Sequence, residues 1–555
     1  MPVLQNLYQI FKFSSTFVID HNCDIRNYSQ GDGMRENNII SIGDNLVFDQ
    51  IRHYYNDTRS PRKIFYDTQV IRKKIHEYKK EGKHTEARIL NRRLVDFLFV
   101  KDIVNVFVDK KSHYKDIGKK GFYLNGNHYV RFCCGSGQMR RNTITFINEK
   151  LYKSITDNLM CGFMSKTKDF NLAKLHAYFA LSFSSVLWVR TPRVCVIKDF
   201  FNPIDPNEKI DFIEKDPKTG KKIIVQKTAG QLRLELNCAD GQGLVDPQFA
   251  QLWGQDMNLS YCPCSFVVRS VFIKGNLATF DFKKYAREHG ITTIRDKWGV
   301  TYNVEDIDVL LSESQFKMHK YYTNWQEYLS YTEKAGIRWG VARYNKKYDD
   351  DYVLANYQYI QALNITKEDI QKLIAPTVDW IRKICSGDNL YTLLYMYGVK
   401  NEDADYQSMY SSAQSLTAKA IVKNSDFLKD TYVQQKIYKN IAESINKAKL
   451  GKIWLHGNYQ FMISDPYAQC QAAFGQKPTG LLKTGEIYSG WWKDRVPSGT
   501  ILDCCRSPMI DISEHNPMDL VYDELKNNWY QYLPTGVIYN IYDISVFRHS
   551  DSDFD

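Results

Sequence analysis

The stretch Asn237-Cys-Ala-Asp-Gly-Gln-Gly-Leu-Val-Asp246 is the part of the sequence on which the expected fold most depends. It places two glycines at turn positions beside Asp240, and glycine adopts tight-turn conformations without steric cost. Basic stretches follow it along the chain, Val268-Arg-Ser-Val-Phe-Ile-Lys274 and then Arg295-Asp-Lys297-Trp-Gly299. A single arginine or lysine usually lies on a solvated surface. The order of these stretches therefore carries more information than any one of them.

Short β-strand patterns surround this stretch between about residues 121 and 340. Trp188-Val-Arg190 and Val194-Cys-Val-Ile197 are strand-like, and Asp216-Pro-Lys-Thr-Gly220 is a strong turn signal. Strands this short, with frequent turns between them, favour a barrel over a doubly wound sheet. The β character returns after Lys452.

A helical section separates the two β regions. Thr366 with Asp369 three residues later is a capping signal for a helix through Ile370 and Ile374, and Pro376 is expected to kink or restart that helix. The expected domains are an N-terminal domain that guides the template (1–120), a first β-barrel region with basic nucleotide-contacting residues (121–345), a helical connector (346–450) and a second β-barrel region with acidic residues (451–555).

Composition indicates a globular protein with a moderately basic surface. Of the 555 residues, 43% are hydrophobic and 14% aromatic, and the net charge is +11. Basic charge with many aromatic side chains suits a nucleic-acid partner, and plain solubility explains the charge equally well. The twelve cysteines show no zinc spacing. With no N-terminal signal and no apolar run of membrane length, we expect a cytoplasmic protein without a membrane partner, in the host cytoplasm if it is phage-encoded.

A basic helical hairpin is expected before the first β region. Nine Lys or Arg and three Glu lie between Arg72 and Arg93, with Gly82 near a break in the helical pattern. Such a hairpin can lie along a nucleic acid, and a solvated helix face is the competing interpretation.

The last residues, Arg548-His-Ser-Asp-Ser-Asp-Phe-Asp555, contain three aspartates within five positions. An acidic, frayed terminus explains them without any function. Alternatively, Asp553 and Asp555 converge on one cation, because alternate residues of an extended segment point the same way. Carboxylate oxygens are ligands that Mg²⁺ prefers. The preceding run from Gly536 to Phe547 is strand-like, as expected of a rigid support.

Five stretches occur in a definite order along the chain. They are Gly135–Asn142, Asp240–Gly243, Arg269 with Lys274 five residues later, Arg506-Ser-Pro508 and Asp553-Phe-Asp555. The ordered set resembles the motifs of one family, the RNA-dependent RNA polymerases of eukaryotic RNA silencing with their single-chain phage and bacterial relatives. The resemblance covers roughly residues 130 to 555.

This resemblance implies a mixed α+β fold in which two double-psi β-barrels are joined by a helical connector and preceded by an N-terminal α/β domain. It implies template-directed RNA synthesis from nucleoside triphosphates on a single-stranded template, with two Mg²⁺ ions. The site residues that it implies are Asp553, Asp555, Lys274 and Lys297 for catalysis, with both aspartates as metal ligands; Arg269, Arg506, Asp240, Gly241 and Gly243 for nucleotide or phosphate binding; and Gln138, Arg140 and Arg141 for the template.

The sequence also departs from the family pattern. Gly275-Asn276 replaces the usual glycine pair, Ser507 stands where Asn is commoner, and Asp555 precedes the Gly-Asp that completes the family's Asp-x-Asp-Gly-Asp motif. We therefore expect a chain truncated within that motif. Three alternatives stay open: a DNA-directed single-chain RNA polymerase, an inactive homologue that only binds nucleic acid, and an unrelated basic protein with an acidic tail.

Overall fold

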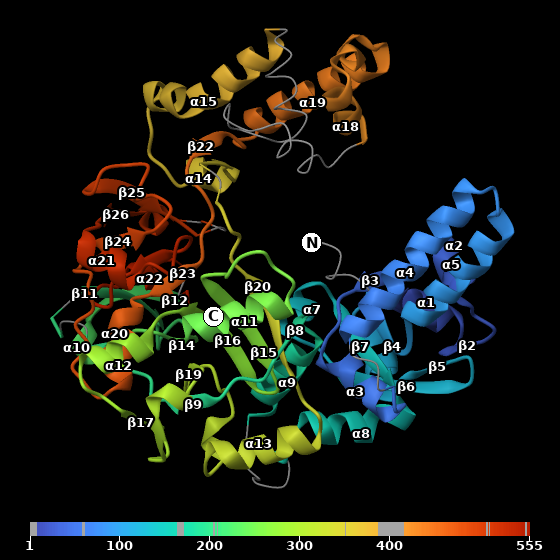
Figure 1. Ribbon diagram of the computed structural model, residues 1–555, viewed down its shortest axis with the longest axis horizontal. Coiled ribbons are helices and arrows are strands. Elements are labelled where there is room, and N and C mark those ends of the chain that lie inside the picture. The colour runs from blue at the N-terminus through green and yellow to red at the C-terminus, as the bar shows by residue number, and fades with distance from the viewer. Residues whose placement is uncertain are drawn as a thin grey trace.

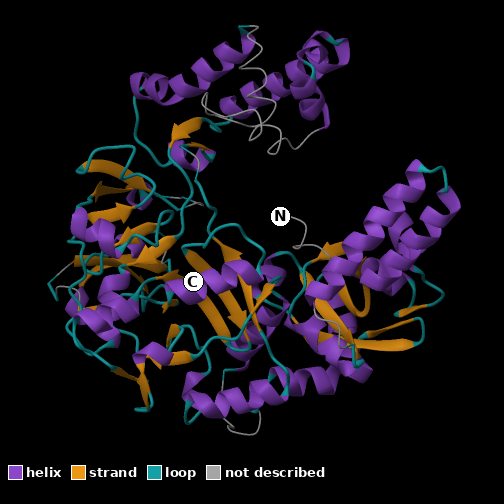
Figure 2. Ribbon diagram, viewed as in Figure 1, coloured by secondary structure: helices purple, strands orange, loops and turns teal. Residues whose placement is uncertain are grey.

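A computed structural model of the chain describes residues 8–57, 61–163, 171–203, 206–207, 209–349, 351–386, 416–506, 509, 511–549 and 552–554. The fold is mixed α+β (Figure 2). In Figure 1 an N-terminal domain lies at the right, a first β region in the centre and a second β region at the left, with the connector helices above them. Among the described residues, none of the helices has the length and apolar character required to cross a membrane.

The N-terminal domain is built on one seven-stranded sheet, in the order β2-β5-β6-β7-β4-β1-β3. Its strands are β1 (Tyr8–Ser14), β2 (Asp24–Ile25), β3 (Ile39–Ile42), β4 (Phe99–Phe107), β5 (Phe122–Leu124), β6 (Asn127–Cys133) and β7 (Thr143–Asn148). Its helices are α1 (Ser15–Asp20), α2 (Gln30–Arg35), α3 (Leu46–Tyr54), α4 (Pro61–Lys80), α5 (His84–Leu98), α6 (His113–Lys120), α7 (Ser136–Arg140), α8 (Glu149–Leu159) and α9 (Leu172–Ala180). Strands from both sides of residue 120 pair in this sheet, so the sheet itself extends beyond the boundary expected there.

Helices α4 and α5 form the expected basic hairpin. The chain turns between them at Gly82, whose φ of +74° is a conformation that glycine adopts readily. The apolar side chains Ile75, Ala87 and Leu94 are buried on its inner side. Figure 1 shows the two helices projecting side by side from the sheet. The predicted helical hairpin is therefore confirmed as a structural element.

The first β region contains a second seven-stranded sheet, in the order β8-β20-β15-β16-β14-β19-β9. Its strands are β8 (Leu187–Val189), β9 (Val194–Ile197), β14 (Gln242–Val245), β15 (Ser265–Ser270), β16 (Ile273–Thr279), β19 (Val309–Ser312) and β20 (Trp339–Tyr344). Three two-stranded ribbons accompany it: β10 (Phe201–Pro203) with β13 (Glu235–Asn237), β11 (Lys209–Lys215) with β12 (Lys222–Thr228), and β17 (Thr293–Arg295) with β18 (Thr301–Asn303). The helices are α10 (Ala229–Leu232), α11 (Pro247–Asp256), α12 (Phe282–Glu288) and α13 (Trp325–Lys334).

The predicted turn at Asp216 is confirmed between β11 and β12. Asp216 accepts hydrogen bonds from Lys218 N at 2.9 Å and Thr219 Oγ1 at 2.5 Å, and Gly220 has a φ of +67°. These contacts are the ones by which an aspartate side chain closes a tight turn.

The described part of the connector contains α14 (Tyr357–Gln361), α15 (Lys367–Cys385), α18 (Leu416–Lys423) and α19 (Thr431–Lys449), with a ribbon of β21 (Tyr352–Leu354) and β22 (Trp454–His456) at its base. Thr366 and Asp369 form the predicted capping box of α15. The predicted restart at Pro376 is wrong, because α15 is one helix. A proline removes a single helix hydrogen bond, and Thr377 anchors the next turn by accepting a bond from Trp454 N at 2.8 Å.

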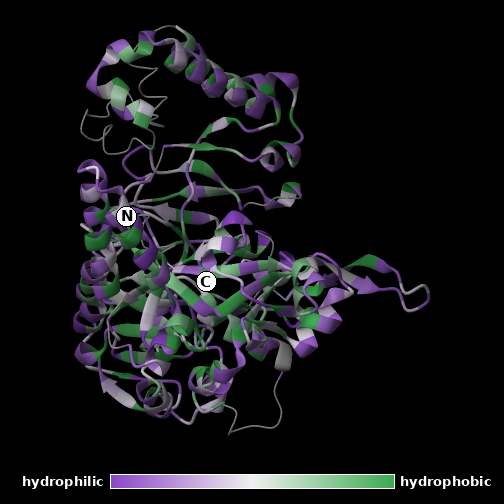
Figure 3. Cartoon of the chain, turned by 90° about the vertical axis from the view of Figure 1, so that its right-hand side faces the viewer, coloured by the Kyte–Doolittle hydropathy of each residue, from purple (hydrophilic) through white to green (hydrophobic). Residues whose placement is uncertain are grey.

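The second β region is a five-stranded sheet in the order β23-β27-β24-β26-β25. Its elements are β23 (Met462–Ser464), β24 (Glu486–Ser489), β25 (Thr500–Cys504), β26 (Asn516–Leu520), β27 (Val537–Tyr539), α20 (Pro466–Ala473), α21 (Glu524–Trp529) and α22 (Ser545–Arg548). Leu244 and Phe280 of the first region share one buried core with Ile463, Tyr488 and Ile538 of the second. Figure 3 shows apolar residues along the strands of this body. The two β regions therefore pack as one unit.

Candidate active site

The Asp240–Gly243 turn lies where glycine is required. Gly241 has a φ of +77°. A Cβ added at Gly243 would come within 2.4 Å of Leu310 O, and one at Gly275 would come within 2.3 Å of Gly241 O. Both distances are shorter than any side chain tolerates, so β14 and β16 approach this closely only with glycine at these two positions. The absence of a second glycine after Gly275 leaves this approach intact.

Gln242, between the two glycines, joins the first β region to the second. Its side chain is fully buried. Its Nε2 donates to Ser464 O and to Gln469 Oε1, both at 3.0 Å, and its Oε1 accepts from Ser464 N at 2.8 Å. Gln469 Nε2 donates in return to the Gln242 main-chain oxygen at 2.8 Å. The amide is therefore fully used across the interface, which sequence inspection did not identify.

The aspartate-bearing end of the chain reaches the same turn. Phe554 N donates to Asp240 O at 3.0 Å. Ser552 and Phe554 are buried, while Asp553 between them is exposed. Ser552 Oγ donates to His549 O at 2.5 Å. The backbone that carries Asp553 is thus held on both sides, and the predicted partner Asp555 lies outside the described residues.

The strand expected to support these aspartates is shorter than predicted. Beta strand β27 ends at Tyr539, and the chain continues through a turn into α22. Asn540 Oδ1 accepts from Tyr542 N at 2.9 Å and from Asp543 N at 3.1 Å. The prediction of a strand through Phe547 is wrong, because these side-chain contacts satisfy the backbone in place of a neighbouring strand.

Arg506 lies against the same C-terminal segment. Its Nη1 donates to His549 O at 3.1 Å. His549 is buried, its pKa is lowered because burial disfavours the charged ring, and its Nε2 lies 3.4 Å from Tyr539 Oη. The structure therefore brings the predicted Arg506 motif and the segment of Asp553 together.

Arg269 and Lys274 face each other across a tight hairpin. They are direct partners in the antiparallel register of β15 and β16, so their side chains leave the same face of the sheet. Arg269 Nη1 donates to Val268 O at 2.7 Å. The main-chain N of Lys274 donates to Gln315 O at 3.1 Å. The five-residue spacing read from the sequence is therefore a hairpin that pairs two cations.

Lys297 is the centre of a cluster that the sequence did not reveal. Its Nζ lies 2.7 Å from Glu313 Oε1 and also hydrogen-bonds His319 Nδ1. Burial, together with the Lys297 ammonium, lowers the pKa of His319 to about 4. His319 is therefore neutral near pH 7, and its Nδ1 accepts from Lys297. Burial favours the neutral form of Glu313, but its bond to Lys297 outweighs this and lowers the pKa.

A chain of hydrogen bonds runs from Lys297 to the Asp-Gly turn. Asp199 N donates to Glu313 Oε2 at 3.3 Å, and Ser314 Oγ donates to Asp199 Oδ1 at 3.2 Å. Gly241 N in turn donates to Ser314 Oγ at 2.9 Å. Burial raises the pKa of Asp199. Glu313, Ser314 and His319 lie 16 or more residues after Lys297, which is why no local motif announced them.

The predicted template-binding residues lie in a different part of the molecule, at the end of α7. The Gln138 amide is used internally, since Oε1 accepts from Gly135 N at 2.9 Å and Nε2 donates to Thr145 Oγ1 at 2.7 Å. Arg140 and Arg141 are exposed. Gln138 therefore shapes the turn, and the two arginines are the members of this set that face solvent.

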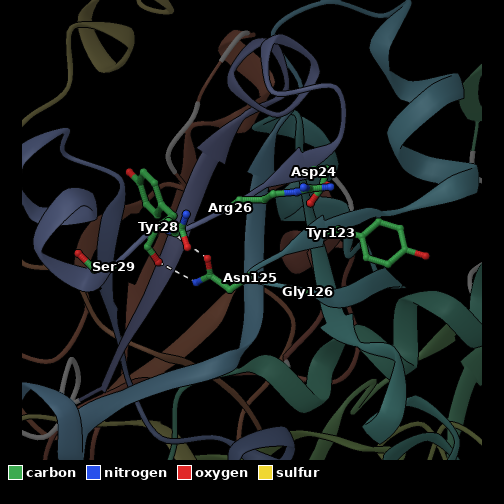
Figure 4. Close-up of a pocket in the computed structure, with 8 residues that line it drawn as sticks. Asp24, Arg26, Tyr28, Ser29, Tyr123, Asn125 and Gly126 are labelled. Atoms are coloured by element: carbon green, nitrogen blue, oxygen red, sulfur yellow. Dashed lines mark hydrogen bonds and ion pairs between the residues drawn. The ribbon is translucent and has the colours of Figure 1, made fainter.

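A shallow pocket also lies in the N-terminal domain, between the ends of β2 and β5 (Figure 4). The amide of Asn125 pairs with the backbone of Tyr28, accepting from its N at 2.9 Å and donating to its O at 2.8 Å. Arg26 is paired with Asp24 beside it. These contacts close the pocket's own loops, and none of its lining residues belongs to the predicted site.

The carboxylates beside the turn suit a hard divalent cation. Asp553 is exposed on a fixed backbone, and Asp240 is half-buried directly against that backbone. Carboxylate oxygens are the ligands of Mg²⁺ in phosphoryl-transfer enzymes. The two residues therefore fit such an ion, and no residue nearby supplies a competing soft donor to Asp553 among the contacts described here.

Acidic residues on one β region and cations on the other, joined at a single turn, define a candidate site for phosphoryl transfer. The family model described as RNA dependent RNA polymerase matches residues 56–510, and the chain belongs to this family. The family expected from the ordered motifs is thus confirmed.

Two relatives extend this finding. The chain is 26% identical over 454 residues to the DNA-directed RNA polymerase YonO of Bacillus phage SPbeta, which covers 80% of this chain and 49% of that protein. Its fold is similar to that of the RNA dependent RNA polymerase QDE-1 from Thielavia terrestris, with a TM-score of 0.55 and 12% identity, covering 82% of this chain and 48% of that one. The chain spans about half the length of both relatives.

Proposed function

We propose that the chain is part of an enzyme that synthesises RNA on a nucleic-acid template from nucleoside triphosphates by two-metal nucleotidyl transfer. The observation that carries the proposal is the hydrogen bond from Phe554 N to Asp240 O, which holds the aspartate segment of the second β region on the Asp-Gly turn of the first. The proposal includes the finer fold expected from the family, in which the two β regions are double-psi barrels.

In this mechanism Asp553, with Asp555 and Asp240 beside it, holds Mg²⁺, which stabilises the attacking and leaving oxygens of the transfer. Lys297 approaches the phosphates of the incoming nucleotide, and its bond to Glu313 fixes its position. Arg269 and Lys274 leave one face of their hairpin and neutralise charge that builds on the phosphate oxygens. Arg506 positions the ribose or phosphate from the opposite region. Arg140 and Arg141 guide the template.

The template is RNA by family membership, and the similarity to the phage DNA-directed RNA polymerase YonO gives the second candidate. The aspartates and lysines serve either template equally. We therefore propose RNA-dependent synthesis as the main function and DNA-directed synthesis as the alternative.

The test is Mg²⁺-dependent incorporation of labelled nucleotides by the chain, expressed with the full reading frame to which it belongs, on single-stranded RNA and DNA in parallel. Asp553→Asn should abolish incorporation, whereas Asp551→Asn, an aspartate of the same tail outside the assigned set, should leave it near the wild-type rate. Incorporation on DNA alone would favour the alternative. Template binding without incorporation on either would contradict the enzymatic proposal and favour a protein that only binds nucleic acid.

A further inference from the structure

Three potential metal ligands meet at the open end of the hairpin formed by β25 and β26. Asp503 is in β25, Cys505 follows that strand, and His515 precedes β26. His515 Nδ1 lies 2.7 Å from Asp503 Oδ2 and 3.7 Å from Cys505 Sγ. The carboxylate, thiol and imidazole atoms all lie within 4.8 Å of one another. Ligands of a tetrahedral Zn²⁺ are roughly 3.4 Å apart, since each lies about 2.0–2.3 Å from the metal. The cluster therefore has the dimensions of a metal site.

The hydrogen bonding of His515 independently indicates a cation. Its Nε2 lies 3.2 Å from Tyr359 O, while its Nδ1 faces the Asp503 carboxylate. Both ring nitrogens thus face acceptors, and a neutral imidazole has only one N–H. A histidine that binds a metal through one nitrogen typically donates its other N–H to a backbone carbonyl. His515 has this arrangement, with Nε2–H on Tyr359 O and Nδ1 directed at the other two ligands.

We propose that Asp503, Cys505 and His515 bind a thiophilic divalent cation of the Zn²⁺ type. Thiolate and imidazole donors select such ions over Mg²⁺, so this site is distinct from the carboxylate site at Asp553. Cys505 and Asp503 are partly open to solvent, which leaves the fourth position to water. Metal binding replaces the proton of the thiol, as it does at other cysteine sites.

The position of the site gives the ion a structural consequence. Cys505 directly precedes Arg506, whose Nη1 reaches His549 O. Asp503 Oδ1 also accepts from Asn516 N at 3.1 Å, which fixes the end of the hairpin. His515 extends the link to Tyr359 of the connector helix α14. A bound ion therefore fastens the start of the Arg506 loop to β26 and to the connector.

Sequence spacing did not predict this site. The cysteines follow no zinc pattern, because only one of them is a ligand and the other two ligands are Asp503 and His515. Pairing of Cys504 with Asn516 in the hairpin is what sets Cys505 opposite His515.

The proposal is tested by cobalt titration of the untagged, reduced protein after treatment with a chelator. Wild type should bind one Co²⁺ with a thiolate-to-cobalt absorption band in the near ultraviolet. Cys505→Ser should lose that band, and Asp503→Asn should weaken binding at least as much as the roughly 10–100-fold that loss of an outer-shell partner costs. Cys385→Ser, which removes an exposed cysteine elsewhere, should titrate like wild type.

Two outcomes would overturn the site: wild type that binds no Co²⁺ at micromolar concentration, or Cys505→Ser with an unchanged spectrum. Circular dichroism of each variant checks folding, and Cys505→Ser decides the question even if a His515 variant does not fold. Metal content measured by mass spectrometry after growth with zinc identifies the native ion. None of these measurements requires polymerase activity, so failure of the proposed function leaves the test valid.

Discussion

Replacement of Gln242 by alanine should separate the two β regions energetically. The change removes three side-chain hydrogen bonds and leaves Ser464 N, Ser464 O and Gln469 Oε1 without those partners in a buried interface. Each buried polar group left unsatisfied costs about 1–3 kcal/mol. The expected loss of local stability is therefore about 3 to 6 kcal/mol, a large fraction of the ~5–15 kcal/mol that holds a typical domain.

Amide hydrogen exchange followed by mass spectrometry measures this loss where it occurs. A loss of 3 kcal/mol corresponds to exchange roughly 100-fold faster in peptides that cover β14 and β23. Gln471→Ala is the matched control, since Gln471 lies on the same helix α20 and bonds only to exposed Thr479 and Gly480. It should change exchange by less than about tenfold. If Gln242→Ala accelerates exchange no more than this control, the assigned role of Gln242 is wrong.

Two further predictions concern charge. Burial and Lys297 hold the pKa of His319 near about 4, below the ordinary 6.5, so the unfolded chain binds more protons between these values and stability should fall as pH decreases from 6.5 to 4; urea unfolding of His319→Gln should show a shallower decrease, and parallel pH profiles would contradict this. Replacing Arg88, Arg92 and Arg93 of α5 by alanine should reduce the salt dependence of nucleic-acid binding, by up to about 0.7 in the log–log slope per lost phosphate contact on a single strand; the same change in a triple variant of Lys218, Lys221 and Lys222 would show only a general charge effect, and an unchanged slope would exclude the hairpin as a template contact.

The features predicted correctly from the sequence are those that local chemistry determines. The turn at Asp216 and the capping box at Thr366 are satisfied by their own neighbours, so a few residues define them. The basic hairpin follows from helical periodicity and Gly82. The Asp240–Gly243 turn was recognised because two glycines adjoin an aspartate, and its close approach to Gly275 explains why they are needed.

The features that were missed depend on contacts between distant segments. Glu313 and His319 join Lys297 only through tertiary folding. The strand pattern after Tyr539 has the right apolar residues, but Asn540 and Asp543 satisfy the backbone and end the strand. His515 meets Cys505 through strand pairing, with no recognisable spacing. Periodicity identifies elements, whereas such meetings follow from the arrangement of whole elements.

Three consecutive residues of one turn explain why the site holds together. Asp240 O binds the backbone of the aspartate segment, Gly241 N connects through Ser314 to the Lys297 cluster, and the Gln242 side chain binds the second β region. The carboxylates and the cations are thus referenced to the same few backbone atoms, although they come from opposite ends of the chain. Phosphoryl transfer tolerates little misplacement of its charged groups. A turn that bonds both sets directly fixes their separation, so a shift in either region is transmitted to the other through Asp240, Gly241 and Gln242.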